Sequence, residues 1–178
     1  MMETSFEFTC NECGQIHRGL AAWHFEAPLQ ALAIPQADLE ARIALTEDDC
    51  VIDEREFYLK GLLELPVHGV GDPFVLGIWL SVSAESYRRF ASVFDDPRRS
   101  AGDRFFGWVC NEIPGYSGTM LLKANLHVRE YPMRPWVELE PTPHPLSNDQ
   151  REGLTIDRAI ELTQLMLHPH GPPGDHRR

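Results

Sequence analysis

The stretch FVLGIWLSV, residues 74–82, constrains the fold more than any other part of the chain. Every second residue is apolar, so one face of an extended strand would carry Phe74, Leu76, Ile78, Leu80 and Val82. Val75 and Trp79 make the opposite face partly apolar as well. A strand that buries both faces lies inside a sheet and is covered on both sides. We therefore expect residues 74–82 to form a central strand.

Four further stretches have the alternation that is typical of strands. EFYLKGLLELPV, residues 56–67, places apolar side chains on one face, namely Phe57, Leu59, Leu63 and Leu65. LLKANLHVRE, residues 121–130, alternates between apolar and polar residues throughout. That pattern predicts a strand with one solvated face, as in an antiparallel sheet. Residues 105–112 and 136–140 add two shorter strands.

Helical spacing follows the central strand and returns near the end of the chain. Residues 84–94 repeat apolar residues every three or four positions, and Ser83 is placed to cap the first turn. A last helix is expected from about Thr155, with one side formed by Ile156, Ala159, Ile160, Thr163 and Leu167. Residues 36–45, QADLEARIAL, are also helix-prone.

Strands cluster in the middle of the sequence, helices are few, and no regular β-α-β alternation is present. The pattern predicts an α+β fold, in which two or three helices pack on one face of a mostly antiparallel sheet. At 178 residues the chain fits one domain, which we place at residues 1–167. The remaining segment, residues 168–178 (HPHGPPGDHRR), is predicted to be a disordered tail.

The charge balance limits the partners. The net charge is −11, from 16 basic and 27 acidic residues, and the basic residues do not cluster. Nucleic-acid binding needs Lys and Arg side chains that neutralise phosphates, so we expect no nucleic-acid partner. A basic protein partner is easier to accommodate, although the charge can also serve solubility alone. No apolar run is long enough to span a membrane and no signal peptide is evident, so we expect a cytoplasmic protein.

The segment FTCNECGQIH carries a candidate metal site. Cys10, Cys13 and the following Gly14 have the form of a zinc knuckle, and His17 lies within reach of the same ion. A structural zinc takes four ligands, and no second Cys-x-x-Cys pair exists, so the fourth must come from a distant part of the chain. Cys50 is the first candidate, ahead of His144 and Cys110.

Two other interpretations of the cysteines remain open. A redox pair would need a helix directly after the second cysteine, and no apolar helical pattern follows Cys13. The thiols can also be unrelated, and Cys110 beside Trp108 is typical of a small buried hydrophobe. If zinc is bound, four protein ligands would make it structural, whereas three ligands and a water would leave it open for catalysis.

Other side chains with catalytic potential have simpler explanations. His144 lies between two prolines and can act as a ligand or base, but a ring that hydrogen-bonds a carbonyl is the more common case. Carboxylates gather around Cys50, namely Asp48, Asp49, Asp53 and Glu54. Such a run is more often a solvated boundary of a strand than an acid–base pair. The chain has no P-loop, nucleophile elbow or dinucleotide fingerprint, so we assign no catalytic or cofactor-binding residue.

Five segments in fixed order carry a resemblance to a known family: FTCNECGQIH, DDCVID, FVLGIWLSVSAESYRRF, FFGWVCNEIPGY and HPLSNDQREGLT. Over roughly residues 6–160, the chain resembles the bacterial family known as domain of unknown function 2199. The resemblance implies a small single-domain bacterial protein. It implies no activity, substrate or catalytic residue.

These observations lead to two functional hypotheses. The first is a non-enzymatic α+β domain, stapled by a structural zinc on Cys10, Cys13, His17 and Cys50, that binds another protein in a regulatory or immunity-type role. The alternative is a metal-dependent enzyme with an open zinc site and with His144 or Asp49 as the base. The fourth ligand discriminates between them.

Overall fold

The computed structural model describes residues 6–20 and 22–169. Over this part of the chain it contains ten strands: β1 (Glu7–Thr9), β2 (Ile16–Arg18), β3 (Ala22–His24), β4 (Ile43–Leu45), β5 (Asp49–Ile52), β6 (Glu56–Leu65), β7 (Phe74–Val82), β8 (Arg104–Val109), β9 (Lys123–His127) and β10 (Trp136–Leu139). The α-helices of the same residues are α1 (Leu29–Leu32), α2 (Leu39–Arg42), α3 (Ala84–Val93), α4 (Pro145–Glu152) and α5 (Ile156–Leu167). A short 3-10 turn, Gln36–Asp38, precedes α2.

The long antiparallel hairpin of β6 and β7 organises the sheet, with Phe57 opposite Val82 and Leu65 opposite Phe74. Each of its strands has two partners along its outer edge. On β7, the parallel strand β3 pairs first and the antiparallel strand β8 pairs further along. On β6, β5 pairs near the start and β10 nearer the end. The expected central strand is therefore present, with neighbours on both sides.

Five strands close into a barrel in the order β6-β7-β8-β9-β10. Four of the contacts are antiparallel, and the ring is completed by a short parallel pairing of β10 with β6 at Trp136 and Leu62. The sequence analysis predicted a mostly antiparallel sheet with helices packed on one face, and the helix-packed sheet is the part of the prediction that is wrong. Closure removes the free edges of these strands, and it leaves one inner face to be filled by side chains.

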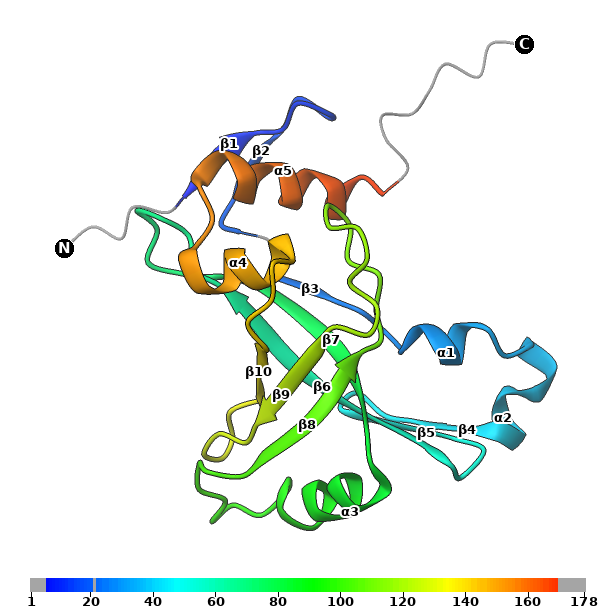
Figure 1. The fold of residues 1–178 in the computed structure, drawn as a ribbon. Helices are drawn as coiled ribbons and strands as arrows, with labels where there is room; N and C mark the ends of the chain where they lie inside the picture. Colours follow the sequence, from blue (N-terminus) through cyan, green and yellow to red (C-terminus); the bar gives the residue numbers. More distant parts are fainter. Residues whose placement is uncertain (1–5, 21, 170–178) are drawn as a thin grey trace, which may run out of the picture.

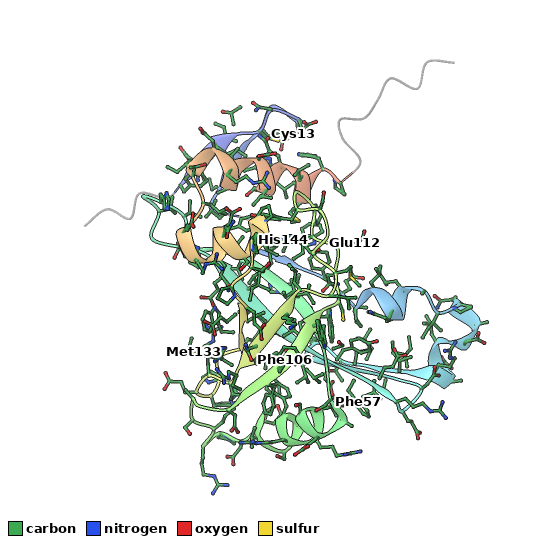
Figure 2. All side chains as sticks on the ribbon, in the orientation of Figure 1. Cys13, Phe57, Phe106, Glu112, Met133 and His144 are labelled. Atoms are coloured by element: carbon green, nitrogen blue, oxygen red, sulfur yellow. The ribbon has the colours of Figure 1, made fainter. Side chains whose placement is uncertain are left out.

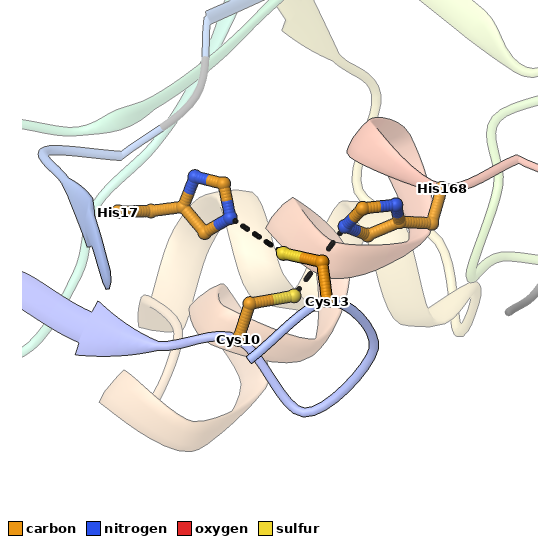
Figure 3. Close-up of side chains that lie close together, drawn as sticks. All are labelled: Cys10, Cys13, His17 and His168. Atoms are coloured by element: carbon orange, nitrogen blue, oxygen red, sulfur yellow. Dashed lines mark hydrogen bonds between the residues drawn. The ribbon is translucent and has the colours of Figure 1, made fainter. Parts of the chain in front are cut away.

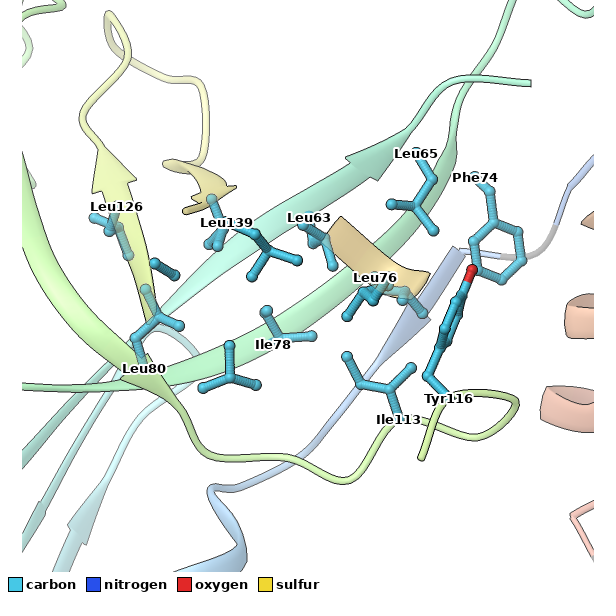
Figure 4. Close-up of a cluster of buried hydrophobic side chains, with 14 of the residues drawn as sticks. Leu63, Leu65, Phe74, Leu76, Ile78, Leu80, Ile113, Tyr116, Leu126 and Leu139 are labelled. Carbon is cyan, nitrogen blue, oxygen red and sulfur yellow. The ribbon is translucent and has the colours of Figure 1, made fainter. Parts of the chain in front are cut away.

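The inner face of the barrel is the main core (Figure 4). It is filled by alternate residues of the five strands, including Leu59, Leu63, Leu76, Ile78, Leu80, Ala124, Leu126 and Val137. A second, smaller core lies on the outer face of the β6–β7 hairpin and comprises Ala27, Ala31, Cys50, Ile52, Tyr58, Trp79 and Cys110. The two cores explain why β7 is apolar on both faces.

The helices lie at both ends of the barrel and beside it (Figure 1). Helix α3 lies at one end, while α4, α5 and the β1–β2 hairpin lie at the opposite end. Helices α1 and α2 project to one side together with β4 and β5. The fold is thus α+β, but its helices do not form a layer on one face of a sheet.

The predictions for individual helices agree with the structure better than the prediction for the whole sheet does. Helix α3 spans residues 84–93, and Ser83 accepts the capping hydrogen bond from the Ser86 backbone N–H. Helix α5 begins after Thr155 as expected. Residues 36–45 form only short helical turns before they enter β4. In the described part of the chain, no helix has both the length and the apolar character needed to cross a membrane.

Candidate functional site: a Cys/His group between the two ends of the chain

The candidate site begins at the tight turn between β1 and β2. The Gly14 N–H donates to the Cys10 carbonyl over 2.9 Å, and the Cys10 N–H donates to the Gln15 carbonyl over 2.8 Å. Gly14 has φ 71°, a left-handed conformation that L residues with a side chain adopt at a cost. The turn brings Cys13 back beside Cys10, and the pairing of β1 with β2 places His17 opposite Phe8. Cys10, Cys13 and His17 are therefore brought together by local structure alone.

The fourth side chain of the group is His168, which directly follows α5. The helix is positioned by a buried stripe of Ala159, Leu162, Thr163 and Met166. Its end is continued by a hydrogen bond from the His168 N–H to the Gln164 carbonyl, 2.9 Å long. As Figure 3 shows, the imidazole of His168 points toward the sulfur atoms of the hairpin. The packing of α5 thus places a second imidazole beside the β1–β2 hairpin.

The spacing of the four donor atoms fits a small metal ion. One ligand atom from each of Cys10, Cys13, His17 and His168 lies within 4.8 Å of all the others. The Cys10 Sγ to His168 Nε2 distance is 3.4 Å, and the Cys13 Sγ to His17 Nε2 distance is 3.5 Å. Tetrahedral ligands at bond lengths of about 2.0–2.3 Å are separated from each other by roughly 3.3–3.8 Å. Two sulfurs and two imidazole nitrogens could therefore hold a metal ion here.

The backbone of the β1–β2 turn also favours the thiolate form of Cys10, which is the form that binds a metal ion. Burial on its own raises the pKa of Cys10, but hydrogen bonds from the backbone of Cys13 and Glu12 stabilise the thiolate and lower the pKa overall. Because thiolate is the form that binds metals, this favours ligation. Cys10 is buried and Cys13 is exposed, so the group lies at the surface with one sulfur covered by protein.

Cys50 and Cys110 are not part of this group. Cys50 lies on β5 opposite Tyr58, and both cysteines are fully buried in the second core. Burial raises the pKa of the Cys50 thiol to about 11 and also raises the pKa of Cys110. The donor that the structure places beside Cys10, Cys13 and His17 is His168 rather than Cys50.

His144 has a structural role. Its Nε2 donates to the Ser117 carbonyl over 2.8 Å, and its Nδ1 accepts from the Leu146 N–H, which caps the first turn of α4. The ring is thus fixed by two backbone groups, and the expectation of a carbonyl-bound ring is confirmed. Within the described residues it belongs to no cluster of metal-ligating side chains.

The carboxylates around Cys50 are engaged with neighbouring side chains. Asp53 forms a two-pronged ion pair with Arg42, at 2.8 and 2.6 Å. Asp48 pairs with Arg134 at 2.8 Å. Asp49 accepts a hydrogen bond from the Tyr87 hydroxyl at 2.5 Å. Asp48 and Asp53 thus pair with arginines, and Asp49 is bound by a tyrosine hydroxyl.

Comparison with protein families confirms the family resemblance seen in the sequence. Residues 9–154 match the model of a family described as an uncharacterized protein conserved in bacteria (DUF2199). The chain belongs to this family. No curated protein and no solved structure is significantly similar to it. The matched region of this DUF2199 chain contains Cys10, Cys13 and His17, whereas His168 lies beyond its end.

The fourth donor escaped the sequence analysis because His168 was assigned to the tail. Its position directly after the apolar stripe of α5 was the available signal, since a docked helix fixes the residue that follows it. Residues 170–178 lie outside the described part of the chain, so the predicted disorder of that segment stays a prediction, as does the domain end at residue 167.

Proposed function

We propose that this chain is a zinc-stapled, non-enzymatic binding domain for another protein in the cytoplasm. The observation that carries the proposal is the set of four protein donors, Cys10, Cys13, His17 and His168, within 4.8 Å of one another. Four protein ligands fill a tetrahedral zinc and leave no position for a reactive water. The ion would join the N-terminal hairpin to the end of α5 and so fasten both to the barrel.

The donor types favour zinc and a structural role. Two thiolates with two imidazoles make a common structural zinc set, whereas catalytic zinc more often uses histidines and carboxylates with an open position. Thiolate sulfur also discriminates against magnesium and calcium, which prefer oxygen ligands. The alternative hypothesis, an enzyme with an open zinc, would require one of the four donors to stay away from the ion.

The metal part of the proposal is tested by metal content and by spectroscopy. Elemental mass spectrometry on untagged protein, purified without chelator, should find about one zinc per chain. Cobalt substitution should give the intense visible absorption of a tetrahedral site with two thiolates. A five- or six-coordinate cobalt spectrum would favour the open site, and a protein without metal would refute the staple.

A surface for a protein partner is available on the outer side of β8 and β9. We call it the aromatic face, and it comprises Arg104, Phe106, Trp108 and Lys123. The β8 side chains alternate, so that Phe106 and Trp108 point outward and are 42% and 38% exposed. Their rings meet edge to face at 5.4 Å, and the Lys123 Nζ lies 5.7 Å from the Trp108 ring centre. In Figure 2, Phe106 lies well away from Cys13, so binding here would not disturb the Cys/His group.

The chemistry of the aromatic face points to the type of partner. Exposed aromatic residues serve as anchors in protein interfaces because they bury a large area with few rotatable bonds. A hollow of about 340 Å³ adjoins Phe106 and Trp108 and is also lined by Ser81, Ser83 and Ser86. Arg104 and Lys123 make the surface locally basic although the whole chain carries −11. We therefore favour a partner segment with an apolar anchor and nearby carboxylates.

A comparative pull-down from bacterial lysate tests the binding part. Phe106→Ala/Trp108→Ala should lose a stoichiometric partner that the wild type retains. Leu32→Ser is a matched control, because Leu32 is 69% exposed on α1, away from this face. Retention should weaken as salt is raised, since the Arg104 and Lys123 contacts are screened. Equal retention by all three proteins, or no stoichiometric partner, would refute the aromatic face as the binding surface.

A further inference from the structure

Lys60 occupies an unusual place for a lysine. The sequence contains only two lysines, Lys60 and Lys123. Lys60 lies in β6 on the outer face of the hairpin, directly opposite Trp79 on β7. It is 9% exposed, whereas lysine is almost never buried without a partner. A buried lysine does little for solubility, so the position of Lys60 needs another explanation.

The amino group of Lys60 has no counterion among the described residues. Its Nζ takes part in no ion pair or hydrogen bond with them and lies 5.4 Å from the centre of the Trp79 ring. Arg134 pairs with Glu47 at 3.1 Å and with Asp48 at 2.8 Å, and Glu26, the other carboxylate of the cavity walls, forms no ion pair with Lys60. The buried amine is thus available for another molecule.

The amine faces a cavity of about 700 Å³, which is large enough for a small molecule. The walls come from segments far apart in the sequence and are formed by His24, Glu26, Leu45, Thr46, Glu47, Lys60 and Arg134. Gly77 leaves space for the His24 ring in the cavity wall, because a Cβ at position 77 would lie 2.2 Å from the His24 Nδ1. The fold brings several polar groups to one hollow around a single buried amine.

We propose that Lys60 captures a small hydroxylated aldehyde or ketone in this cavity as an imine. The neutral Nζ attacks the carbonyl carbon, the π electrons move to the oxygen, and a proton passes from nitrogen to oxygen to give a carbinolamine. Loss of this hydroxyl as water then leaves the C=N bond, so one amine and one carbonyl yield one imine and one water. This inference goes beyond the proposed binding function and does not depend on the zinc staple.

The surroundings of the amine make its neutral form more accessible than in an exposed lysine. Burial lowers the pKa of Lys60, and the positive charge of Arg134 lowers it further. Asp48, Glu47 and Glu26 act in the opposite direction without restoring the ordinary value. His24, on β3, also has a lowered pKa, chiefly from burial, and so adds little positive charge near neutral pH. A desolvated lysine amine is the nucleophile that imine formation requires.

The walls also indicate the kind of carbonyl compound. Glu26 and Glu47 place carboxylate oxygens at the cavity, and these accept hydrogen bonds from hydroxyl groups. Arg134, also in the wall, is paired with Glu47, so Glu26 leaves the walls net negative and unfavourable to an anionic ligand. A neutral, hydroxylated carbonyl compound therefore suits the cavity better than a carboxylated one.

Reductive trapping tests the proposal on the full chain. Glycolaldehyde and cyanoborohydride at pH 7 convert a trapped imine to a stable hydroxyethyl amine, which peptide mass spectrometry locates. We expect Lys60 to be labelled several-fold faster than Lys123, because burial lowers the pKa of Lys60 and so raises its share of neutral amine. In denaturant the two lysines should react at similar rates. Equal rates in the folded protein, or faster labelling of Lys123, would overturn the proposal.

Two controls keep the test specific to the cavity. Glyoxylate, an aldehyde with a carboxylate, should label Lys60 more slowly than glycolaldehyde does, and the reverse order would overturn the ligand class. Glu26→Gln changes one wall without removing the amine, and we expect it to narrow the difference between the two aldehydes. Circular dichroism should show that this variant is folded, and an unchanged preference would contradict the role of the wall.

Discussion

The Sγ of Cys10 lies 3.4 Å from the Nε2 of His168, 158 residues further along the chain. Cys10 belongs to the turn after the first strand, and His168 follows the last helix. A contact between the β1–β2 hairpin and the end of α5 constrains both at once, because neither can leave without breaking it. A metal ion held at this point would make the connection much stronger than a hydrogen bond.

The first prediction separates His168 from Cys50 as the fourth ligand. His168→Ala should abolish zinc binding and lower the melting temperature by roughly 6–12 °C, if the lost ligand costs about 3 kcal/mol. Cys50→Ala should keep about one zinc per chain, because Cys50 lies in the second core. Metal content and thermal unfolding of both variants check this. Zinc lost from Cys50→Ala and kept in His168→Ala would reverse the assignment.

The elements were predictable where the signal is local. Alternation in β7 and β9 and the Ser83 cap of α3 depend on neighbours in sequence, and the structure reproduces them. Barrel closure depends on one short parallel contact between Trp136 and Leu62, which leaves no periodic trace in either strand. The sequence therefore predicted a sheet with helices packed on one face in place of a barrel.

The candidate site was likewise predictable only for the residues that lie close together in the sequence. Cys10, Cys13 and His17 lie within one hairpin, and their spacing already indicates a shared site. The fourth donor depends on where α5 docks, which is a property of the whole core. Cys50 was a reasonable sequence candidate because thiols are good zinc ligands, but β5 places it against Tyr58.

A second prediction concerns the closure of the barrel at Gly61. A Cβ at this position would lie 2.6 Å from Val137 Cγ2 and 3.1 Å from Leu126 Cδ1. Gly61→Ala should therefore push β6 away from the strands across the barrel and cost about 1–3 kcal/mol of unfolding free energy. Urea unfolding measures this. Gly71→Ala is the matched control, because its Cβ would meet no atom within 4 Å, and it should change little. Similar values for both variants would argue against a tightly closed barrel.

A third prediction concerns alkaline pH. Burial, followed by the negative charges of Asp49 and Glu56, raises the pKa of Cys50 to about 11 from an ordinary value of 9.0. Above pH 9 the unfolded chain loses this proton more readily than the folded chain, so its stabilising contribution is complete below pH 9 and is lost as pH rises toward 11. Between these values the wild type should lose about 1–2 kcal/mol more stability than Cys50→Ala. Parallel curves for the two proteins in chemical unfolding would contradict the raised pKa.

The last prediction compares two adjacent arginines. Arg99 is 8% exposed and donates to the backbone carbonyls of Phe94, Arg129 and Met133, which ties the loop after α3 to the loop after β9. Arg99→Met would leave these carbonyls without their donor and should cost about 3 kcal/mol. Arg98 has a 90% exposed side chain that pairs with Asp96, so Arg98→Met should change stability by less than about 0.5 kcal/mol.

The same pair of variants also locates the effect. Hydrogen exchange of Arg99→Met should rise first in the loops after α3 and β9, because Arg99 connects them, while the Cys/His hairpin should keep its protection. The Tyr131 N–H, which donates to the Arg99 carbonyl over 3.1 Å, is a suitable reporter. If Arg99→Met and Arg98→Met unfold at the same urea concentration, the three carbonyl contacts contribute nothing measurable. The Phe94 and Tyr131 rings, which lie 4.8 and 5.8 Å from the Arg99 guanidinium carbon, must then pack equally well on methionine.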